Sequence, residues 1–250
     1  MNVVHLPFVY NFESKTKLNY FVMGNVGYSK VSLSGSVEEL PGGAVLNYLN
    51  IIQTYTGGFG GGVGYALSKN ILISTGLEVI YSRSGASVIK PDNGVGDVIE
   101  DFFNKNYSDN ISYKFFTSLE YRTTIKKFKP YVSLEYNIYE TKSSFSFSDL
   151  TSFDSESSIV SINVGVETPR LLSYDKDNYL TLEAYVQGHK LFGVVKDVAK
   201  VDNYGSLGGV AYWNTSAEPW WASRFFFEAN GVKGDGIYGY NVGLGFTLDF

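Results

Sequence analysis

The chain has 250 residues, a formal net charge of −5 at pH 7 and no cysteine. The acidic balance argues against a nucleic-acid partner held by phosphate neutralisation, and the lack of cysteine excludes a disulfide scaffold and a thiolate metal site. Only two histidines, His5 and His189, are present, which argues against a histidine-rich zinc site. We therefore expect no nucleic-acid partner, no metal and no cofactor.

Aromatic residues make up 16% of the chain, and there are 27 glycines but only 6 prolines. A β-barrel places aromatic residues at membrane interfaces and small residues on its crowded inner wall, so this composition favours a barrel. No stretch approaches the roughly 18 consecutive apolar residues of a membrane-spanning helix, so strands would have to cross any membrane. The opening residues MNVVHLPFVYNF lack a secretory signal, and we expect that such a signal has been removed.

Apolar and polar residues alternate with a period of two from end to end, which predicts strands with two different faces. An early case is Leu18, Tyr20 and Val22, which alternate with small or polar residues. The closing segment is the most regular, with Tyr238, Val242 and Phe246 on one face and glycine or polar residues on the other. In chain order, the predicted strands cover residues 3–13, 17–34, 54–67, 71–87, 110–125, 130–145, 157–169, 179–195, 205–214, 221–230 and 237–250.

Two features favour a membrane barrel over a soluble barrel or sandwich, in which strands also alternate. The face opposite the apolar one is rich in glycine and alanine, as in residues 57–66, where a soluble surface would usually carry lysine, glutamate and threonine. Connections also alternate between short turns and long polar segments, the layout of bacterial outer-membrane barrels. We predict an all-β fold, an antiparallel transmembrane β-barrel of 10–12 strands with short periplasmic turns and longer extracellular loops. Eight strands are a second possibility.

Eleven predicted segments conflict with the even strand number of single-chain bacterial barrels. One explanation is that residues 1–250 form a single barrel domain that lacks an N-terminal strand or segment before Met1. The other is that one segment within the less regular residues 196–236 is not a wall strand. Both explanations stay open at this point.

Three stretches carry a family resemblance: HLPFVYNF with YFVMGNVGYS, GGFGGGVGYALSKNILISTGLEVIYSRSGA, and YKFFTSLEYRTTIKKFKPYVSLEYNIY. They resemble the small outer-membrane β-barrel proteins of Bacteroidota, often called porin-family proteins. The resemblance covers nearly the whole chain, but its motifs are strand and turn patterns without chemistry. It implies a β-barrel membrane protein of the cell envelope, located in the bacterial outer membrane, with outer-membrane lipid as its surroundings.

The end of the chain resembles the carboxyl-terminal strand by which the barrel-assembly machinery is thought to recognise its clients. The residues that carry this resemblance are Phe246, Leu248 and Phe250. It implies that the assembly machinery is a partner during biogenesis. The alternative is an edge strand that happens to end in phenylalanine.

By the alternation of the strands, seven ionisable residues fall on the predicted inner face of the barrel. The opposite placement would be costly, because a Lys or Arg that faces lipid loses roughly 2–4 kcal/mol. These residues are Glu78, Lys114, Glu120, Arg122, Glu135, Glu167 and Glu183. In one interpretation the two cations bridge the glutamates and the network plugs a narrow lumen. In the other, excess carboxylates line a thin aqueous path that prefers cations. A barrel of 10–12 strands lies nearer the filled type, so we favour the plug.

No catalytic constellation is visible. Residues 57–64 do not fit a G-x-G-x-x-G loop, and GSLGG at 205–209 is not a nucleophile elbow. His189 and Glu183 would share the inner face of one strand, but spacing alone nominates no serine for them to activate. We therefore expect an interior histidine and not an enzyme.

Tyr212, Trp213, Trp220 and Trp221 cluster around a short turn and predict an aromatic belt at the membrane interface, or a patch that docks another envelope protein. Taken together, these features predict an outer-membrane barrel with a structural, anchoring or partner-binding role. A narrow cation-preferring channel for small solutes or ions is the first alternative. A lipid-modifying enzyme of the outer membrane is the second.

Overall fold

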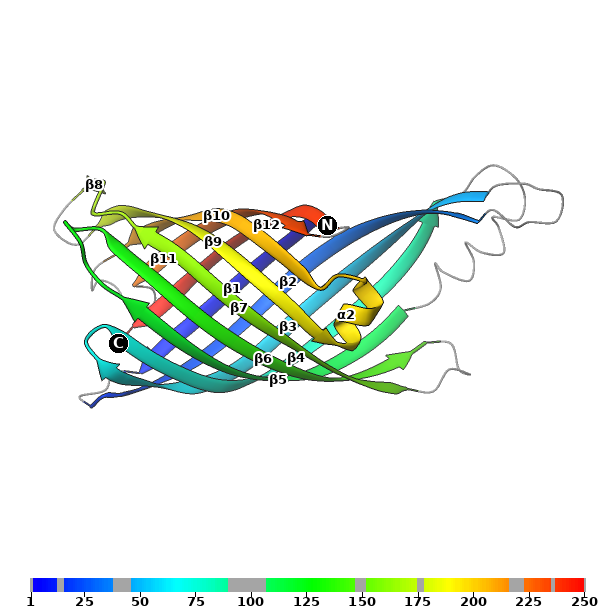
Figure 1. Cartoon of the computed structure of the whole chain (residues 1–250), viewed down its shortest axis with the longest axis horizontal. Helices are drawn as coiled ribbons and strands as arrows, with labels where there is room; N and C mark the ends of the chain where they lie inside the picture. Colours follow the sequence, from blue (N-terminus) through cyan, green and yellow to red (C-terminus); the bar gives the residue numbers. More distant parts are fainter. Residues whose placement is uncertain are drawn as a thin grey trace.

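The computed structural model describes residues 2–12, 16–37, 46–89, 107–146, 152–174, 178–215, 223–234 and 237–249. In this part of the chain eleven long strands form a closed barrel with almost no helix (Figure 1). The wall strands are β1 (Asn2–Phe12), β2 (Leu18–Val37), β3 (Leu46–Ser68), β4 (Ile71–Ile89), β5 (Tyr107–Arg122), β6 (Lys129–Phe145), β7 (Phe153–Glu167), β9 (Tyr179–Gly193), β10 (Asn203–Asn214), β11 (Arg224–Gly234) and β12 (Ile237–Asp249).

Two short elements lie at opposite ends of this barrel. The two-residue strand β8 (Leu172–Ser173) pairs with the start of β9 at the end where short turns join the strands. The helix α2 (Val194–Ala199) lies at the opposite end, between β9 and β10 (Figure 1). Within the described residues no helix is long and apolar enough to cross a membrane.

Each predicted segment corresponds to one wall strand, so the all-β barrel and its range of 10–12 strands are confirmed, and the eight-strand alternative is wrong. The largest difference is at β3, which begins at Leu46 instead of residue 54. It does so because its first residues pair with the extended end of β2, from Val31↔Ile52 to Val37↔Leu46. Both β10 and β11 are wall strands, so the suggestion that one segment of 196–236 lies outside the wall is also wrong.

The odd strand number is accommodated at the seam between β1 and β12. An odd count makes the first and last strands run in the same direction, and these two strands pair in parallel, from Asn2↔Tyr240 to Asn11↔Asp249. The register skips Leu6 and Pro7. Proline has no backbone N–H to donate, and parallel pairs are slightly less stable per residue than antiparallel ones. We therefore expect this seam to be less stable per residue than the antiparallel junctions of the wall.

The two faces of the wall differ sharply in exposure. On β5, the outward ring of Phe115 is 42% exposed, whereas the next residue, Phe116, faces the lumen and is 7% exposed. On β4, Leu77 is 63% exposed and Glu78 is 5% exposed. Large apolar side chains therefore cover the outside of the barrel, and polar and ionisable side chains fill the inside.

Inward-facing glycines make room for inward-facing rings on the neighbouring strand. A Cβ added to Gly165 would lie 2.7 Å from three atoms of the Tyr131 side chain, two ring carbons and the hydroxyl oxygen, and Tyr131 is the cross-strand partner of Gly165. The pairs of this kind are His5 with Gly243, Phe21 with Gly62, Phe116 with Gly76, Tyr131 with Gly165, Tyr185 with Gly208, and Phe226 with Gly245. The glycine bias of the chain thus reflects rings that lie flat against the inner wall.

Candidate functional site in the barrel lumen

The most connected carboxylate in the lumen is that of Glu167, which is 1% exposed at the end of β7. Its oxygens lie 3.4 Å from Lys129 Nζ, 3.5 Å from Arg122 Nη1 and 3.7 Å from Arg224 Nη2. Arg122 also reaches Glu120, with Nε 3.0 Å from the carboxylate. Five charged side chains from four strands therefore meet at the short-turn end of the barrel.

Glu183 lies directly opposite Glu167 in the β7–β9 register, so two inward carboxylates face each other across the ladder. Like charges in this position repel unless other groups compensate them. Glu183 is held by hydroxyls: Tyr131 donates a 2.6 Å hydrogen bond to one oxygen and Tyr212 a 3.1 Å bond to the other. The repulsion is therefore offset by cations on one side and by phenols on the other.

The two tyrosines that hold Glu183 also connect it to the arginines of the Glu167 cluster. The Arg122 guanidinium lies 4.6 Å from the centre of the Tyr131 ring, and Arg224 lies 4.5 Å from the centre of the Tyr212 ring. A guanidinium over a ring face is attracted by the ring quadrupole. Each tyrosine thus accepts a cation on its face and donates its hydroxyl to a carboxylate.

The predicted aromatic belt is wrong for Tyr212, which does not lie on the same face of the wall as Trp213. Tyr212 and Trp213 are consecutive residues of β10, so their side chains point to opposite faces of the wall. Trp213 is outward, 48% exposed, and stacks on Tyr174 with ring centres 5.7 Å apart. Tyr212 belongs to the lumen, and Trp220 and Trp221 lie outside the described residues.

A second cluster surrounds Glu78 on β4, also on the inner face of the barrel. Lys114 Nζ lies 3.4 Å from its carboxylate, Asn25 donates a hydrogen bond to it, and Lys114 also lies over the Phe116 ring. Glu135 accepts a 2.6 Å hydrogen bond from Asn137. All seven predicted lumen charges therefore lie on the inner face, but they form separate clusters.

Sequence reasoning missed a third cluster, around Glu228 on β11. Tyr185 donates a hydrogen bond to its carboxylate, Asn230 donates a 2.9 Å bond to the Tyr185 hydroxyl, and His5 Nε2 lies 3.7 Å from the carboxylate. The signal was present, because Glu228 alternates with the apolar Phe227 and Ala229 just as Glu78 alternates with Leu77 and Val79.

The structure also gives His189 a serine partner. Ser161 Oγ lies 2.8 Å from His189 Nδ1, the two residues are cross-strand partners, and the Tyr204 ring stacks on the imidazole at 4.4 Å. An activated nucleophile needs a third group that orients the base. Within the described residues no acid is hydrogen-bonded to the other imidazole nitrogen, and no group of three or more His, Asp and Glu side chains could hold a metal ion.

At the carboxyl-terminal strand, Phe246 faces outward and stacks on Phe8 of β1 with ring centres 6.1 Å apart. Leu248 pairs through its backbone with Tyr10. Phe250 lies outside the described residues. Phe246 thus helps to close the parallel seam, and its role as an assembly signal stays a prediction.

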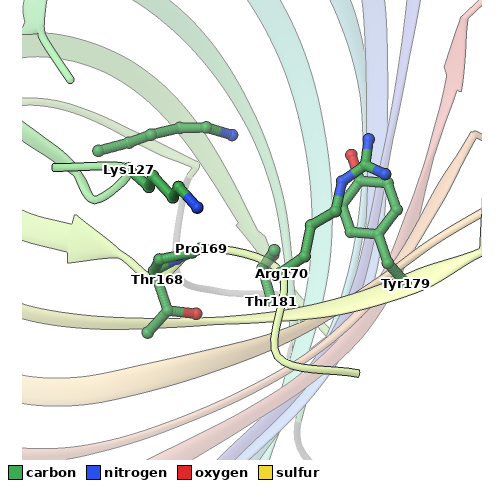
Figure 2. Close-up of a pocket in the computed structure, with 7 residues that line it drawn as sticks. Lys127, Thr168, Pro169, Arg170, Tyr179 and Thr181 are labelled. Atoms are coloured by element: carbon green, nitrogen blue, oxygen red, sulfur yellow. The ribbon is translucent and has the colours of Figure 1, made fainter. Parts of the chain in front are cut away.

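A cavity of about 450 Å³ opens at the short-turn mouth of the barrel (Figure 2). Its lining comes from the β5–β6 turn, the segment after β7 and the start of β9. The lining residues are Lys127, Lys129, Thr168, Pro169, Arg170, Tyr179 and Thr181. Among these seven described lining residues three are cations and none is an acid.

Comparisons of the chain with known protein families, with curated proteins and with solved structures each find no match. The functional argument therefore rests on the two faces of the barrel and on the contacts in its lumen.

Proposed function

We propose that this chain is an integral β-barrel of the bacterial outer membrane that serves a structural, anchoring or partner-binding role. The observation that carries the proposal is an apolar outer wall bounded by two rows of aromatic side chains, with no charge facing outward between the rows on β2, β3 and β5. Short turns then lie on the periplasmic side and the longer connections outside. A relation to the porin-family barrels of Bacteroidota is part of the same proposal.

The two aromatic rows lie at opposite ends of the outer wall. Near the short turns the row contains Phe12, Tyr20, Tyr65, Tyr121 and Trp213, and at the other end it contains Tyr28, Tyr55, Tyr81, Tyr113 and Tyr240. From Tyr20 to Tyr28, or from Tyr55 to Tyr65, a strand covers roughly 26–33 Å. At a tilt of about 40° this spans about 20–25 Å, close to the apolar band of outer-membrane barrels.

Charge is excluded from the outer wall between these rows. On β2, β3 and β5, the strands that carry a member of both rows, no Asp, Glu, Lys or Arg faces outward between the two aromatic residues. Outward charges appear at the level of the far row, where Glu140 is the cross-strand partner of Tyr113. Farther out, Arg83 and Asp109 form a 2.7 Å ion pair and the Tyr81 hydroxyl donates to the same carboxylate. A soluble barrel would gain solubility from charges on this surface, whereas a membrane barrel loses roughly 2–4 kcal/mol for each Lys or Arg at the midplane.

The filled lumen favours a structural role over wide permeation. Six inward carboxylates in the described part of the chain each have a partner, and rings such as those of Tyr131 and Tyr185 are 5% and 4% exposed. Eleven strands also lie nearer to the eight-stranded barrels, whose interiors side chains just fill, than to the 16-stranded channels.

A narrow cation-preferring channel is the second candidate, and one observation favours it. Within the described residues the buried side-chain oxygens of Asn137, Asn163 and Asn241 have no hydrogen-bond partner. Buried amide oxygens usually bind protein donors or ordered water, so a path of ordered water through the lumen would satisfy these three oxygens. Carboxylates along such a path would select cations.

Planar-bilayer conductance separates the two candidates. The structural proposal expects no steady single-channel current from the purified chain. A steady cation-selective current that falls in the double variant Glu120→Gln, Glu135→Gln would establish the channel instead. Ser112→Ala, which removes an inward hydroxyl without changing charge, is the matched control and should leave any current unchanged.

A further inference from the structure

The junction between β1 and β12 differs from every other junction of the described wall. All other neighbouring wall strands pair in the antiparallel direction, whereas β1 and β12, which lie side by side in Figure 1, run in the same direction. Two edges that run in the same direction can both be paired in the antiparallel way by one strand placed between them, running opposite to both. The seam therefore has the geometry of a site for one added strand.

The backbone pairing along the seam is interrupted at Leu6 and Pro7. The β1–β2 ladder continues through the same positions, with Pro7 opposite Asn25. The Pro7 carbonyl lies against Gly245 of β12, because a Cβ added to that glycine would contact the carbonyl oxygen. The N and C=O of one residue in an extended strand point to the same edge, so the missing N–H of Pro7 also faces the seam. The sequence thus places a gap in the ladder on the seam edge of β1.

Side chains hold the seam closed on both sides of this gap. On the inner face the His5 ring lies across Gly243, and its Nε2 is 3.7 Å from the Glu228 carboxylate of β11. On the outer face Phe8 stacks on Phe246 with ring centres 6.1 Å apart. Each contact joins β1 to the neighbouring strands through one ring. Separation of these two contacts and of the interrupted ladder would open the seam and leave the antiparallel ladders on either side intact.

A buried amide at the seam also lacks a partner. Asn241 of β12 donates a 3.0 Å hydrogen bond to Asn230, but within the described residues its own side-chain oxygen is buried without a donor. Its neighbour across the seam is Val3, whose side chain cannot donate. Buried amide oxygens are usually satisfied, so a polar side chain on an added strand at this position would supply the donor that Val3 does not.

We propose that the seam opens and takes up one extended segment of another polypeptide, which lies between β1 and β12 and runs antiparallel to both. The segment replaces one interrupted parallel ladder by two antiparallel ladders, which are the more stable kind per residue. About ten residues are enough to cross the wall. Apolar residues at alternate positions continue the outward row of Val4 and Val242, and small or polar residues between them face the lumen beside Asn241.

Pro7 limits which segments can bind. It offers an added strand a carbonyl acceptor but no donor, so one carbonyl of the segment stays unpaired at that position. Proline on an exposed strand edge commonly restricts indiscriminate pairing with other chains. The seam therefore selects a segment that fits along the rest of both edges.

This inference rests on the partner-binding role proposed above for its biological meaning, but its physical basis is the strand register. The test is therefore made on the full chain folded in neutral detergent, without lipid. A chain that folded in buffer alone would contradict the membrane proposal and would leave the seam test unchanged. Failure of the seam test would leave the lipid-facing wall unchanged.

The probe is a fluorescent synthetic peptide of residues 18–30, a sequence that pairs antiparallel with β1 in the folded chain. Its binding is followed by fluorescence anisotropy. A peptide of the same composition with its apolar residues grouped at one end is the control probe. We expect saturable binding of the first peptide, at least about tenfold tighter than that of the second, because only the first has the alternation of a wall strand. No saturable binding, or equal affinity of the two peptides, would overturn the proposal.

Disulfide locks test whether the peptide binds at the seam. The chain has no cysteine, so introduced pairs are unambiguous. Val4→Cys with Val242→Cys joins outward partners across the seam, and Val132→Cys with Val164→Cys joins outward partners across the antiparallel β6–β7 junction. The oxidised seam lock should weaken peptide binding by at least about tenfold, because the two edges can no longer separate. Reduction should restore binding, and the oxidised control lock should bind like the parent chain. Equal affinity of the two oxidised locks would overturn the proposal.

Phe8→Ala gives an independent reading that needs no disulfide. It removes the outer ring contact with Phe246, so the seam should open more readily and bind the peptide several-fold more tightly. Phe115→Ala is the matched control, since it removes an outward ring from β5, whose neighbours are both antiparallel, and it should leave the affinity unchanged. Equal affinity of the two variants would overturn the proposal.

Discussion

The inner and outer faces of the barrel wall differ in the charged side chains that they carry. On the inner wall even the directly opposed carboxylates Glu167 and Glu183 are accommodated, because cations and tyrosine hydroxyls surround them. On the outer wall of β2, β3 and β5, charge is absent between the aromatic rows. The same strands carry both faces, so the difference shows that side-chain parity, and not strand identity, separates the two environments.

The largest effect on stability is expected from Glu167→Gln, which removes the carboxylate charge that three cations share on the inner wall. It leaves Arg122, Lys129 and Arg224 around a neutral amide in a buried site. The free energy of unfolding should fall by about 3–5 kcal/mol, measured by urea titration in lipid vesicles. Glu78→Gln, which leaves one lysine without its carboxylate, should lose only about 1.5–3 kcal/mol. Equal losses would contradict the importance of the three-cation cluster.

The outer wall is broken by Leu77→Lys, which places a charge between the aromatic rows at a position 63% exposed. In vesicles the variant should lose about 2–4 kcal/mol of unfolding free energy. Ser144→Lys is the control, since it lies outward beyond the far row and opposite Asp109, and it should change the free energy by less than about 0.5 kcal/mol. A similarly small change for Leu77→Lys would mean that this surface does not face lipid.

Gly165→Ala tests whether the inner glycines make room for the aromatic rings of the neighbouring strand. The added methyl would press on the Tyr131 ring and displace the hydroxyl that holds Glu183, so about 1–3 kcal/mol of stability should be lost. Gly57 has no heavy atom within 4 Å of an added Cβ, and Gly57→Ala should change the free energy of unfolding by less than about 0.5 kcal/mol in the same assay. A tolerated Gly165→Ala would show that the ring can move freely.

The smallest effect is expected from His189→Ala, which removes one hydrogen bond to Ser161 and the stacking on Tyr204. We expect the free energy of unfolding to fall by about 0.5–1.5 kcal/mol. Hydrolysis or acyl transfer of phospholipid or lipopolysaccharide should not differ between the variant and the parent chain. Ser161→Ala should have a similar effect on stability. Hydrolysis or acyl transfer by the parent chain that disappears in both variants would instead support the lipid-modifying enzyme.

Strand positions and parity were largely readable from the sequence, because the period-two alternation is strong in most segments. Partners across strands were not readable, since they depend on register. Lys129 is the cross-strand partner of Glu167 in the β6–β7 register, and Arg224 reaches the same carboxylate from β11, which does not pair with β7. The segment between β7 and β9, which contains the short strand β8, also made the pairing of Ser161 with His189 difficult to predict from the sequence.

The face of Tyr212 and the pairing at the seam differ from the expectations for identifiable physical reasons. Tyr212 was grouped with Trp213 by closeness in sequence, although strand geometry sends consecutive side chains to opposite faces. The parallel pairing of β1 and β12 was not expected, because an even strand number was taken as the rule for closure. The first error concerns the face on which a side chain lies, and the second concerns how the wall closes.

The central claim is that the outer wall faces lipid, and refolding tests it most directly. The urea-unfolded chain is diluted either into lipid vesicles or into buffer without lipid or detergent, and folding is followed by circular dichroism and protease resistance. We predict a protease-resistant β-structure only in the presence of vesicles. A chain that folded to the same resistant, soluble state in buffer alone would contradict the claim.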